Sequence, residues 1–179
     1  SENLQKEEMI KELKKRFKHQ ILDDIEKDKG LGFLEMLAPS RITIIDKTLP
    51  WEEAIERSAL SMIEEGFVGE SYPKEIMELI NGFGNYMVVQ DGIFLGHSKS
   101  INKTGISLAF FKKPVEFPEN EKVRIVLTLA SRDKREHLNG LMEFLGVMRK
   151  KSLIKELDKL DTSNKIYKKI EEFINEEEK

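Results

Sequence analysis

Apolar positions divide the chain into a charge-rich first segment and a longer remainder in which apolar runs alternate with amphipathic stretches. Between residues 3 and about 28, apolar side chains recur at helical spacing in an otherwise highly charged stretch. The apolar positions are Ile10, Leu13, Phe17, Ile21 and Ile25. This spacing predicts one amphipathic helix with a narrow apolar stripe, broken at residues 29–32. We favour a linker as its role; a dimerising helix and a solvated helix packed along the domain are the alternatives.

Beyond residue 41, β-branched and apolar runs typical of strands alternate with amphipathic stretches typical of helices. The expected strands cover residues 42–45, 86–90, 93–95, 105–111 and 123–130. The expected helices begin near Pro50, near Ser71 and at a capping box formed by Asp133 and Glu136, with further short ones at 33–37, 152–157 and 163–174. The order predicts an α/β protein with a mixed central β-sheet and helices on both faces, preceded by the N-terminal helix. We divide the chain into residues 1–38, a helical linker, and residues 39–179, the α/β domain.

Composition narrows the possible functions. The net charge of −3 and the pI near 5.8 argue against direct contact between this region and nucleic acid, because nucleic-acid binders usually carry a basic balance. The sequence has no cysteine, which excludes disulfides, thiolate catalysis and cysteine-based zinc sites. No apolar run approaches the roughly 18–20 residues of a membrane span. We therefore expect no membrane insertion and a cytoplasmic location.

Two of the three histidines lie where ligand chemistry is common in α/β proteins. His97 follows Gly96 at the end of an expected strand, the edge at which open sheets bind ligands. His137 is expected in the first turn of a helix, where free N–H groups and the helix dipole attract phosphate. That field favours a neutral His137 that donates one N–H. The third histidine, His19, is expected to be solvated.

A neutral nucleophilic imidazole beside a hydrogen-bond donor and a helix end suits phosphoryl transfer, provided that the fold brings His97 and His137 together. Spacing along the chain does not decide whether they meet. A zinc site is the other common use of two histidines, but no third ligand is placed clearly. A loop histidine without a role is the plainest interpretation of His97.

Six short motifs follow one another between about residue 40 and residue 157. They are Trp51-Glu52-Glu53-Ala54-Ile55; Gly66-Phe67-Val68 with Tyr72; Gly84-Asn85-Tyr86 with Gly92-Ile93-Phe94-Leu95-Gly96-His97; Thr104-Gly105-Ile106-Ser107; Lys113-Pro114-Val115-Glu116-Phe117; and Leu129-Ala130-Ser131 with Glu136-His137-Leu138. In this order they resemble the mannitol/fructose class of enzyme IIA domains of the bacterial phosphoenolpyruvate-dependent sugar phosphotransferase system. The resemblance covers roughly two-thirds of the chain.

The resemblance implies a phosphohistidine domain that accepts a phosphoryl group from the phosphocarrier protein HPr and usually passes it to an enzyme IIB. By position, His97 would be the acceptor and His137 its neighbour in the active site. Ser98 could add a hydrogen bond to the phosphate, although a plain polar loop residue is an equal interpretation. Lys99 and Lys103 could attract phosphate or simply be solvated. No cofactor and no metal is implied.

Two departures from the transport members of this family bear on function. Transport members usually carry proline before the active histidine, where this chain has Gly96, and mannitol-type domains carry an arginine near the end of the second helix. The matching stretch, Met77-Glu78-Leu79-Ile80-Asn81, has none. Gly96 and the Ser40-Arg41-Ile42 entry look more like the C-terminal enzyme IIA-like domain of BglG-like antiterminators and MtlR-like activators. Upstream regulatory domains of the same chain are then expected. A freestanding enzyme IIA that relays phosphate to enzyme IIB, and a degenerate, non-phosphorylated interaction module, are the alternatives.

Overall fold

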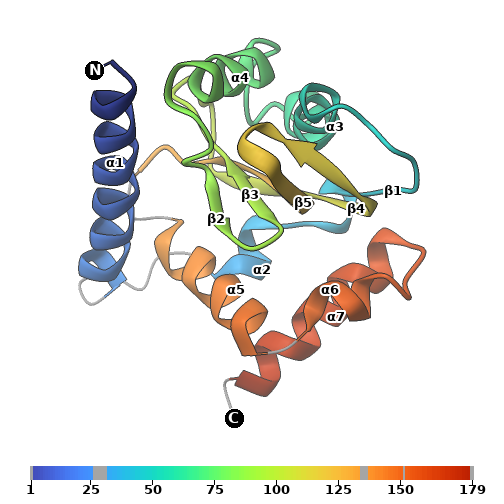
Figure 1. Ribbon diagram of the computed structural model, residues 1–179. Helices are drawn as coiled ribbons and strands as arrows, with labels where there is room; N and C mark the ends of the chain where they lie inside the picture. Colours follow the sequence, from blue (N-terminus) through green and yellow to red (C-terminus); the bar gives the residue numbers. More distant parts are fainter. Residues whose placement is uncertain (1, 26–31, 134–136, 151, 178–179) are drawn as a thin grey trace.

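The computed structural model describes residues 2–25, 32–133, 137–150 and 152–177 (Figure 1). The helices are α1 (Glu2–Ile25), α2 (Phe33–Met36), α3 (Trp51–Glu64), α4 (Tyr72–Phe83), α5 (Leu138–Lys150), α6 (Leu153–Leu157) and α7 (Ser163–Glu177). The strands are β1 (Ile42–Ile45), β2 (Val88–Gln90), β3 (Ile93–Gly96), β4 (Gly105–Phe117) and β5 (Glu121–Ala130), with 3-10 turns at Pro39–Arg41 and Pro118–Asn120. Among these helices, none is long and apolar enough to cross a lipid bilayer.

The strands form one mixed sheet in the order β1-β4-β5-β3-β2. The pairs β1–β4 and β3–β5 are parallel, whereas β4–β5 and β2–β3 are antiparallel. Helices cover both faces of this sheet (Figure 1). The predicted fold class, a mixed central sheet with helices on both faces and a preceding N-terminal helix, is confirmed.

One face of the sheet is covered by α3 and α4. Alternate strand residues point into this layer, where Phe94, Phe111 and Val126 pack with Ile55 of α3 and Ile76 of α4. The small residues of β4 let α3 approach closely: the Ser107 hydroxyl donates to the carbonyl of Ser58 at 2.6 Å. This layer carries α4 to the carboxyl end of β3, where His97 lies.

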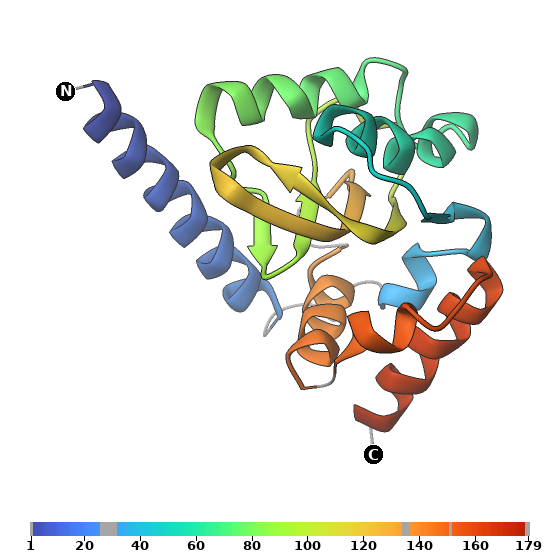
Figure 2. The same ribbon diagram turned by 45° about the vertical axis from the view of Figure 1, so that its right-hand side comes forward.

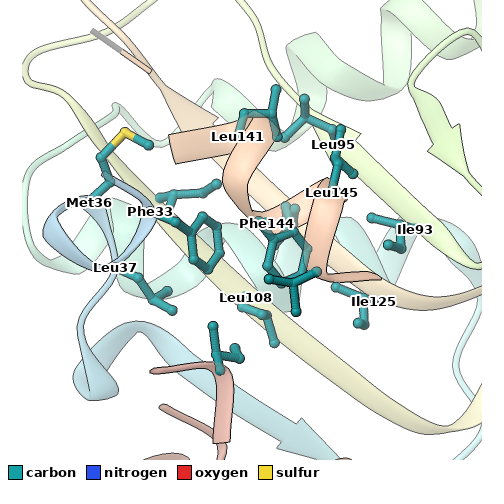
Figure 3. Packing of buried hydrophobic residues seen from close by; sticks show 14 of the residues in the cluster. Phe33, Met36, Leu37, Ile93, Leu95, Leu108, Ile125, Leu141, Phe144 and Leu145 are labelled. Atoms are coloured by element: carbon teal, nitrogen blue, oxygen red, sulfur yellow. The ribbon is translucent and has the colours of Figure 1, made fainter. Parts of the chain in front are cut away.

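The opposite face is covered by α2, α5, α6 and α7 (Figure 2). Figure 3 shows the centre of this layer, where Phe33 of α2 stacks on Phe144 of α5 with ring centroids 4.4 Å apart. Phe33 and Met36 are fully buried, so α2 is part of this core. The domain boundary at residue 38 stays a prediction, and α2 packs with the domain in the structure.

Strand β4 is longer than predicted. We expected it to end at Phe111, with Lys112, Lys113 and Pro114 in a connection, but the strand continues to Phe117. Its register against β5 shifts between Phe110 and Val115. Pro114 lies within this irregularity, where the strand needs no backbone N–H for pairing with β5. The strand can therefore continue through the proline.

Helix α1 lies apart from both helical layers and passes beside β2, between α4 and α5 (Figures 1 and 2). The side chain of Ile10 reaches Gly84, the residue that follows α4: a Cβ atom on Gly84 would lie 3.1 Å from Ile10 Cδ1. The side chains of His19, Ile21 and Ile25, and the break expected after them, lie outside the described part of the chain. Helix α1 therefore lies along the domain, as one of the sequence alternatives held.

Candidate functional site

The parallel pairing of β3 with β5 brings the chain segments that carry the two predicted histidines to one edge of the sheet. Gly96 pairs with Thr128, so the chain leaves β3 at His97 beside the end of β5. His137 directly precedes α5, whereas we expected it inside the first turn of the helix. Its carbonyl accepts the first helical hydrogen bond, from Leu141, so it occupies the N-cap position. Contact between the two rings stays a prediction.

Tyr72, a buried residue at the start of α4, ties these two strand ends together. Its hydroxyl oxygen accepts a hydrogen bond from the backbone N–H of Ser98 at 2.8 Å and donates to the carbonyl of Leu129 at 2.5 Å. Burial raises the pKa of Tyr72 to about 12, so the phenol keeps its proton at neutral pH. The backbone directly after His97 is therefore held to the end of β5.

The ring of His97 is held in one tautomer by its own strand. Nδ1 lies 3.2 Å from the carbonyl oxygen of Leu95. Because a carbonyl can only accept, this contact assigns the proton of the neutral ring to Nδ1 and the lone pair to Nε2. Burial lowers the pKa of His97, and the Leu95 carbonyl opposes this only in part. The imidazole is thus neutral at pH 7, with Nε2 as its nucleophilic atom.

Two aromatic rings enclose the imidazole of His97. Phe17 of α1 stacks on it with ring centroids 5.7 Å apart and an interplanar angle of 15°. Tyr86, between α4 and β2, meets it edge-on at 6.2 Å and 87°. Both geometries are favourable aromatic arrangements. Asn85 anchors the backbone before Tyr86, because its side-chain amide donates to the carbonyl of Pro118.

The hydroxyl of Ser98, which we expected to bind phosphate, is hydrogen-bonded to a carboxylate in this structure. This hydroxyl donates to Glu75 Oε1 at 2.9 Å, and Glu75 Oε2 accepts from the hydroxyl of Ser71 at 2.8 Å. Although burial raises the pKa of Glu75, the hydrogen bonds from Ser71, Ser98 and Ser100 outweigh it and the net pKa is lowered. Ser98 is therefore bound to a carboxylate in this structure, and a phosphate contact would require its hydroxyl to turn.

An open groove of about 500 Å³ lies in front of His97. Its lining residues are Glu75, Glu78, Leu79, Tyr86, His97, Ser98 and Lys99. Glu75 and Glu78 place two carboxylates in this groove, and Glu78 belongs to the stretch from which the family arginine is missing. Lys99 lines the groove as well, whereas the ammonium of Lys103 lies 4.4 Å from the centroid of the Phe67 ring.

His137 is held at the same sheet edge by the end of β5. Its Nδ1 lies 2.9 Å from Ser131 Oγ, and the Ser131 hydroxyl donates to the carbonyl of Asp133. Ser131 therefore accepts the Nδ1 proton, which is the only N–H of a neutral His137. We expected a neutral His137 to give that N–H to phosphate. Because Nδ1–H is already donated to Ser131, His137 could bind a phosphate only through a second N–H, the Nε2–H of an imidazolium. Glu136, also part of the motif, lies outside the described residues.

Sequence reasoning gave no role to the residues that surround His97, although Tyr72 and Tyr86 belong to the motifs that carry the resemblance. Tyr72, Glu75 and Tyr86 are polar or aromatic residues near helix and strand ends, and such positions are common without any role. Their spacing from His97 along the chain carries no signal, because α4 and β3 approach only in the folded sheet. The apolar stripe of the first helix included Phe17, which is partly buried in the structure, but it did not show which residue Phe17 contacts.

Comparisons with known proteins agree with this fold. The family model "Phosphoenolpyruvate-dependent sugar phosphotransferase system, EIIA 2" matches residues 35–173. The mannitol-specific cryptic phosphotransferase enzyme IIA component of Escherichia coli K12 is 25% identical over 122 residues, 66% of this chain and 83% of that protein. The ascorbate-specific PTS system EIIA component of the same organism is 30% identical over 103 residues, 54% of this chain and 67% of that protein.

Solved structures show the same architecture. The solution structure of the mannitol-specific cryptic enzyme IIA from Escherichia coli superposes with a TM-score of 0.67 at 22% identity, covering 80% of this chain and 98% of that one. The crystal structure of IIA mannitol from Escherichia coli gives a TM-score of 0.62 at 18% identity, covering 75% and 98%. At these identities the likeness concerns the fold.

Proposed function

Because the chain belongs to the EIIA 2 family of the phosphoenolpyruvate-dependent sugar phosphotransferase system, we propose that it is a phosphohistidine domain that accepts a phosphoryl group from HPr on His97. The observation that carries this proposal is the state of the His97 ring. It is neutral, its Nδ1 is bound to the carbonyl of Leu95, and its Nε2 keeps the lone pair. An imidazole in this state is ready to act as a nucleophile.

The chemical step follows from that tautomer. The Nε2 lone pair of His97 attacks phosphorus, a new N–P bond forms, and the bond from phosphorus to its donor atom in HPr breaks. No proton leaves His97, because Nε2 carries none and the other proton stays on Nδ1, hydrogen-bonded to the carbonyl of Leu95. His137 would bind a phosphoryl oxygen through Nε2–H once it is protonated, with Nδ1–H held by Ser131. Free N–H groups at the start of α5 supply further donors.

We propose a regulatory role for this chemistry: a sugar-responsive domain of a transcriptional antiterminator or activator, joined to upstream regulatory domains of its own chain. Three features support this role. Gly96 replaces the proline of transport members, Glu75 and Glu78 line the groove in which a cation would help transfer, and α1 lies against His97. With Glu75 and Glu78 facing a single cation, Lys99, the groove is net negative and opposes the incoming phosphoryl group. Such a site suits a switch that is phosphorylated only when the phosphorylated donor is abundant.

The alternative is a relay to enzyme IIB. Relatives named as mannitol-specific and ascorbate-specific components favour it. A mannitol enzyme IIA of this fold, 18% identical to this chain, has been solved in complex with phosphorylated enzyme IIB. The degenerate module is the least supported candidate, because the neutral Nε2 of His97 remains fit for chemistry.

The test is reconstitution with phosphoenolpyruvate, enzyme I and HPr, followed by mass spectrometry. We expect a gain of one acid-labile phosphate on the peptide that contains His97, and none in His97→Ala. A lack of label beside a positive control would contradict the acceptor role. Adding enzyme IIB to the labelled protein then separates the two roles: retention of the phosphate supports the regulatory domain, and rapid loss to enzyme IIB supports the relay.

A further inference from the structure

Helix α1 covers the side of His97 that does not face the open groove. Phe17 covers one face of the imidazole, and Ile10 contacts Gly84, just before Tyr86. We propose that α1 is a detachable cover, which competes inside the chain with the donor protein for the surface formed by Gly84, Tyr86 and His97. This inference rests on the proposed function, since it assigns His97 the role of acceptor.

A docked α1 and a bound donor protein would overlap in space beside His97. Stable protein complexes bury on the order of 800 Å² on each partner, far more than the space around a single ring. A donor that brings phosphorus to Nε2 of His97 must therefore spread over the residues beside it. On one side of His97 those residues, Gly84 and Tyr86, lie against α1, so a donor that spreads to that side meets the helix.

Attachment of α1 is incomplete, which makes it displaceable. A cavity of about 340 Å³ separates part of the helix from β2 and α5. Lys14 and Lys18 of α1 line it opposite Arg149 of α5, and the rest of its lining, Phe17 and Tyr86 included, holds no acidic side chain. Like charges meet across this interface without an acidic partner, which weakens docking. The apolar contacts at Phe17 and Ile10 then hold the helix.

A cover of this kind changes rates in a predictable way. The open form alone reacts, so the observed phosphorylation rate is the intrinsic rate multiplied by the open fraction. Loss of one aromatic contact should raise that fraction about 3- to 10-fold while the closed form predominates. Modification of His97 by a small reagent should rise as well, but by a smaller factor, because the open groove already admits small molecules to the ring.

The experiment compares the full chain with three variants of α1. Phe17→Ala removes the stacked ring, and Ile10→Ala loosens the helix where it touches Gly84. Met9→Ala is the matched control, because its side chain is 45% exposed on the same helix. Two rates are measured for each protein: modification of His97 by diethyl pyrocarbonate, followed by peptide mass spectrometry, and phosphorylation by HPr.

We expect Phe17→Ala and Ile10→Ala to raise the phosphorylation rate about 3- to 10-fold and reagent modification by a smaller factor, and Met9→Ala to leave both rates within about twofold. An unchanged rate of phosphorylation by HPr in both variants, with His97 labelled in the wild type, would overturn the cover. A rise in Phe17→Ala alone would overturn it too, because the effect would then belong to the ring contact and not to the helix. A rise in reagent modification without phosphorylation of any protein would leave the cover standing and remove the acceptor role.

Discussion

At the scale of single residues, the site depends on how two groups are held. The carbonyl of Leu95 selects the tautomer of His97, and the hydroxyl of Tyr72 fixes the backbone that follows it. Neither group takes part in the bond that forms. Together they determine which nitrogen is free and where it lies, and positioning of this kind supplies most of the rate in phosphoryl transfer.

His97 makes stability depend on pH in a defined direction. Its pKa is lower in the folded protein than the roughly 6.5 of an unfolded chain, so unfolding takes up a proton in acid. Its contribution to stability is complete above about pH 6.5 and is lost as the pH falls toward the lower folded value. Urea denaturation at about pH 7.5 and about pH 5.5 should show a larger loss for the wild type than for His97→Gln. Equal losses would contradict the buried, neutral ring.

Removing the Tyr72 hydroxyl should damage both stability and function. Tyr72→Phe leaves the backbone N–H of Ser98 and the carbonyl of Leu129 without this partner, at a cost of about 1–3 kcal/mol. The initial rate of His97 phosphorylation should fall with it. Tyr167→Phe is the control, because that hydroxyl donates to the carbonyl of Leu34, outside the site. An undiminished phosphorylation rate in Tyr72→Phe would show that Tyr72 does not position His97.

At the scale of elements, most of the fold could be predicted because each helix and strand carries its own apolar period. The strand that ends at Gly96 and the helix that follows Pro50 are local patterns, and the structure confirms both. The part that could not be predicted depends on pairing between distant elements. The parallel pairing of β3 with β5 puts His97 and Ser131 at one edge. Nothing in either strand specifies that partner. The stacking of Phe17 on His97 is of the same kind.

Two glycines of α5 test how closely α2 is packed. A Cβ atom on Gly140 would lie 2.7 Å from the backbone nitrogen of Phe33, whereas one on Gly146 would meet nothing within 4 Å. Gly140→Ala should therefore destabilise the domain by about 1–3 kcal/mol. Gly146→Ala, the same change in the same helix, should stabilise it by about 0.5–1 kcal/mol through helix propensity. Chemical denaturation of both variants gives the comparison, and similar effects would contradict the close contact of α2 with α5.

At the scale of the whole molecule, the proposed cover gives the protein two states: α1 docked beside His97, and α1 released so that the donor can bind there. If a phosphoryl group on His97 destabilises the docked helix, helix docking lowers the equilibrium extent of phosphorylation by the same free energy. The phosphoryl group adds bulk and negative charge next to the Phe17 ring. In a regulatory protein, release of α1 would then transmit the phosphorylation of His97 to the upstream domains.

Release of α1 should be visible at Ile10, which lies far along the helix from Phe17. In methyl-labelled protein, the Ile10 methyl signals should shift on phosphorylation toward their position in Phe17→Ala. Phosphorylation conditions applied to His97→Gln provide the control, and no shift is expected there. An Ile10 spectrum that is identical with and without phosphate on His97 would contradict the coupling.

The central claim is that Nε2 of His97 accepts the phosphoryl group. The most direct measurement is a proton–nitrogen NMR correlation of ¹⁵N-histidine-labelled protein, recorded before and after phosphorylation by HPr. The tautomer held by Leu95 predicts one phosphohistidine, with phosphorus bonded to Nε2 of His97 and the proton on Nδ1. Phosphorus on Nδ1, or on another histidine, would contradict the account.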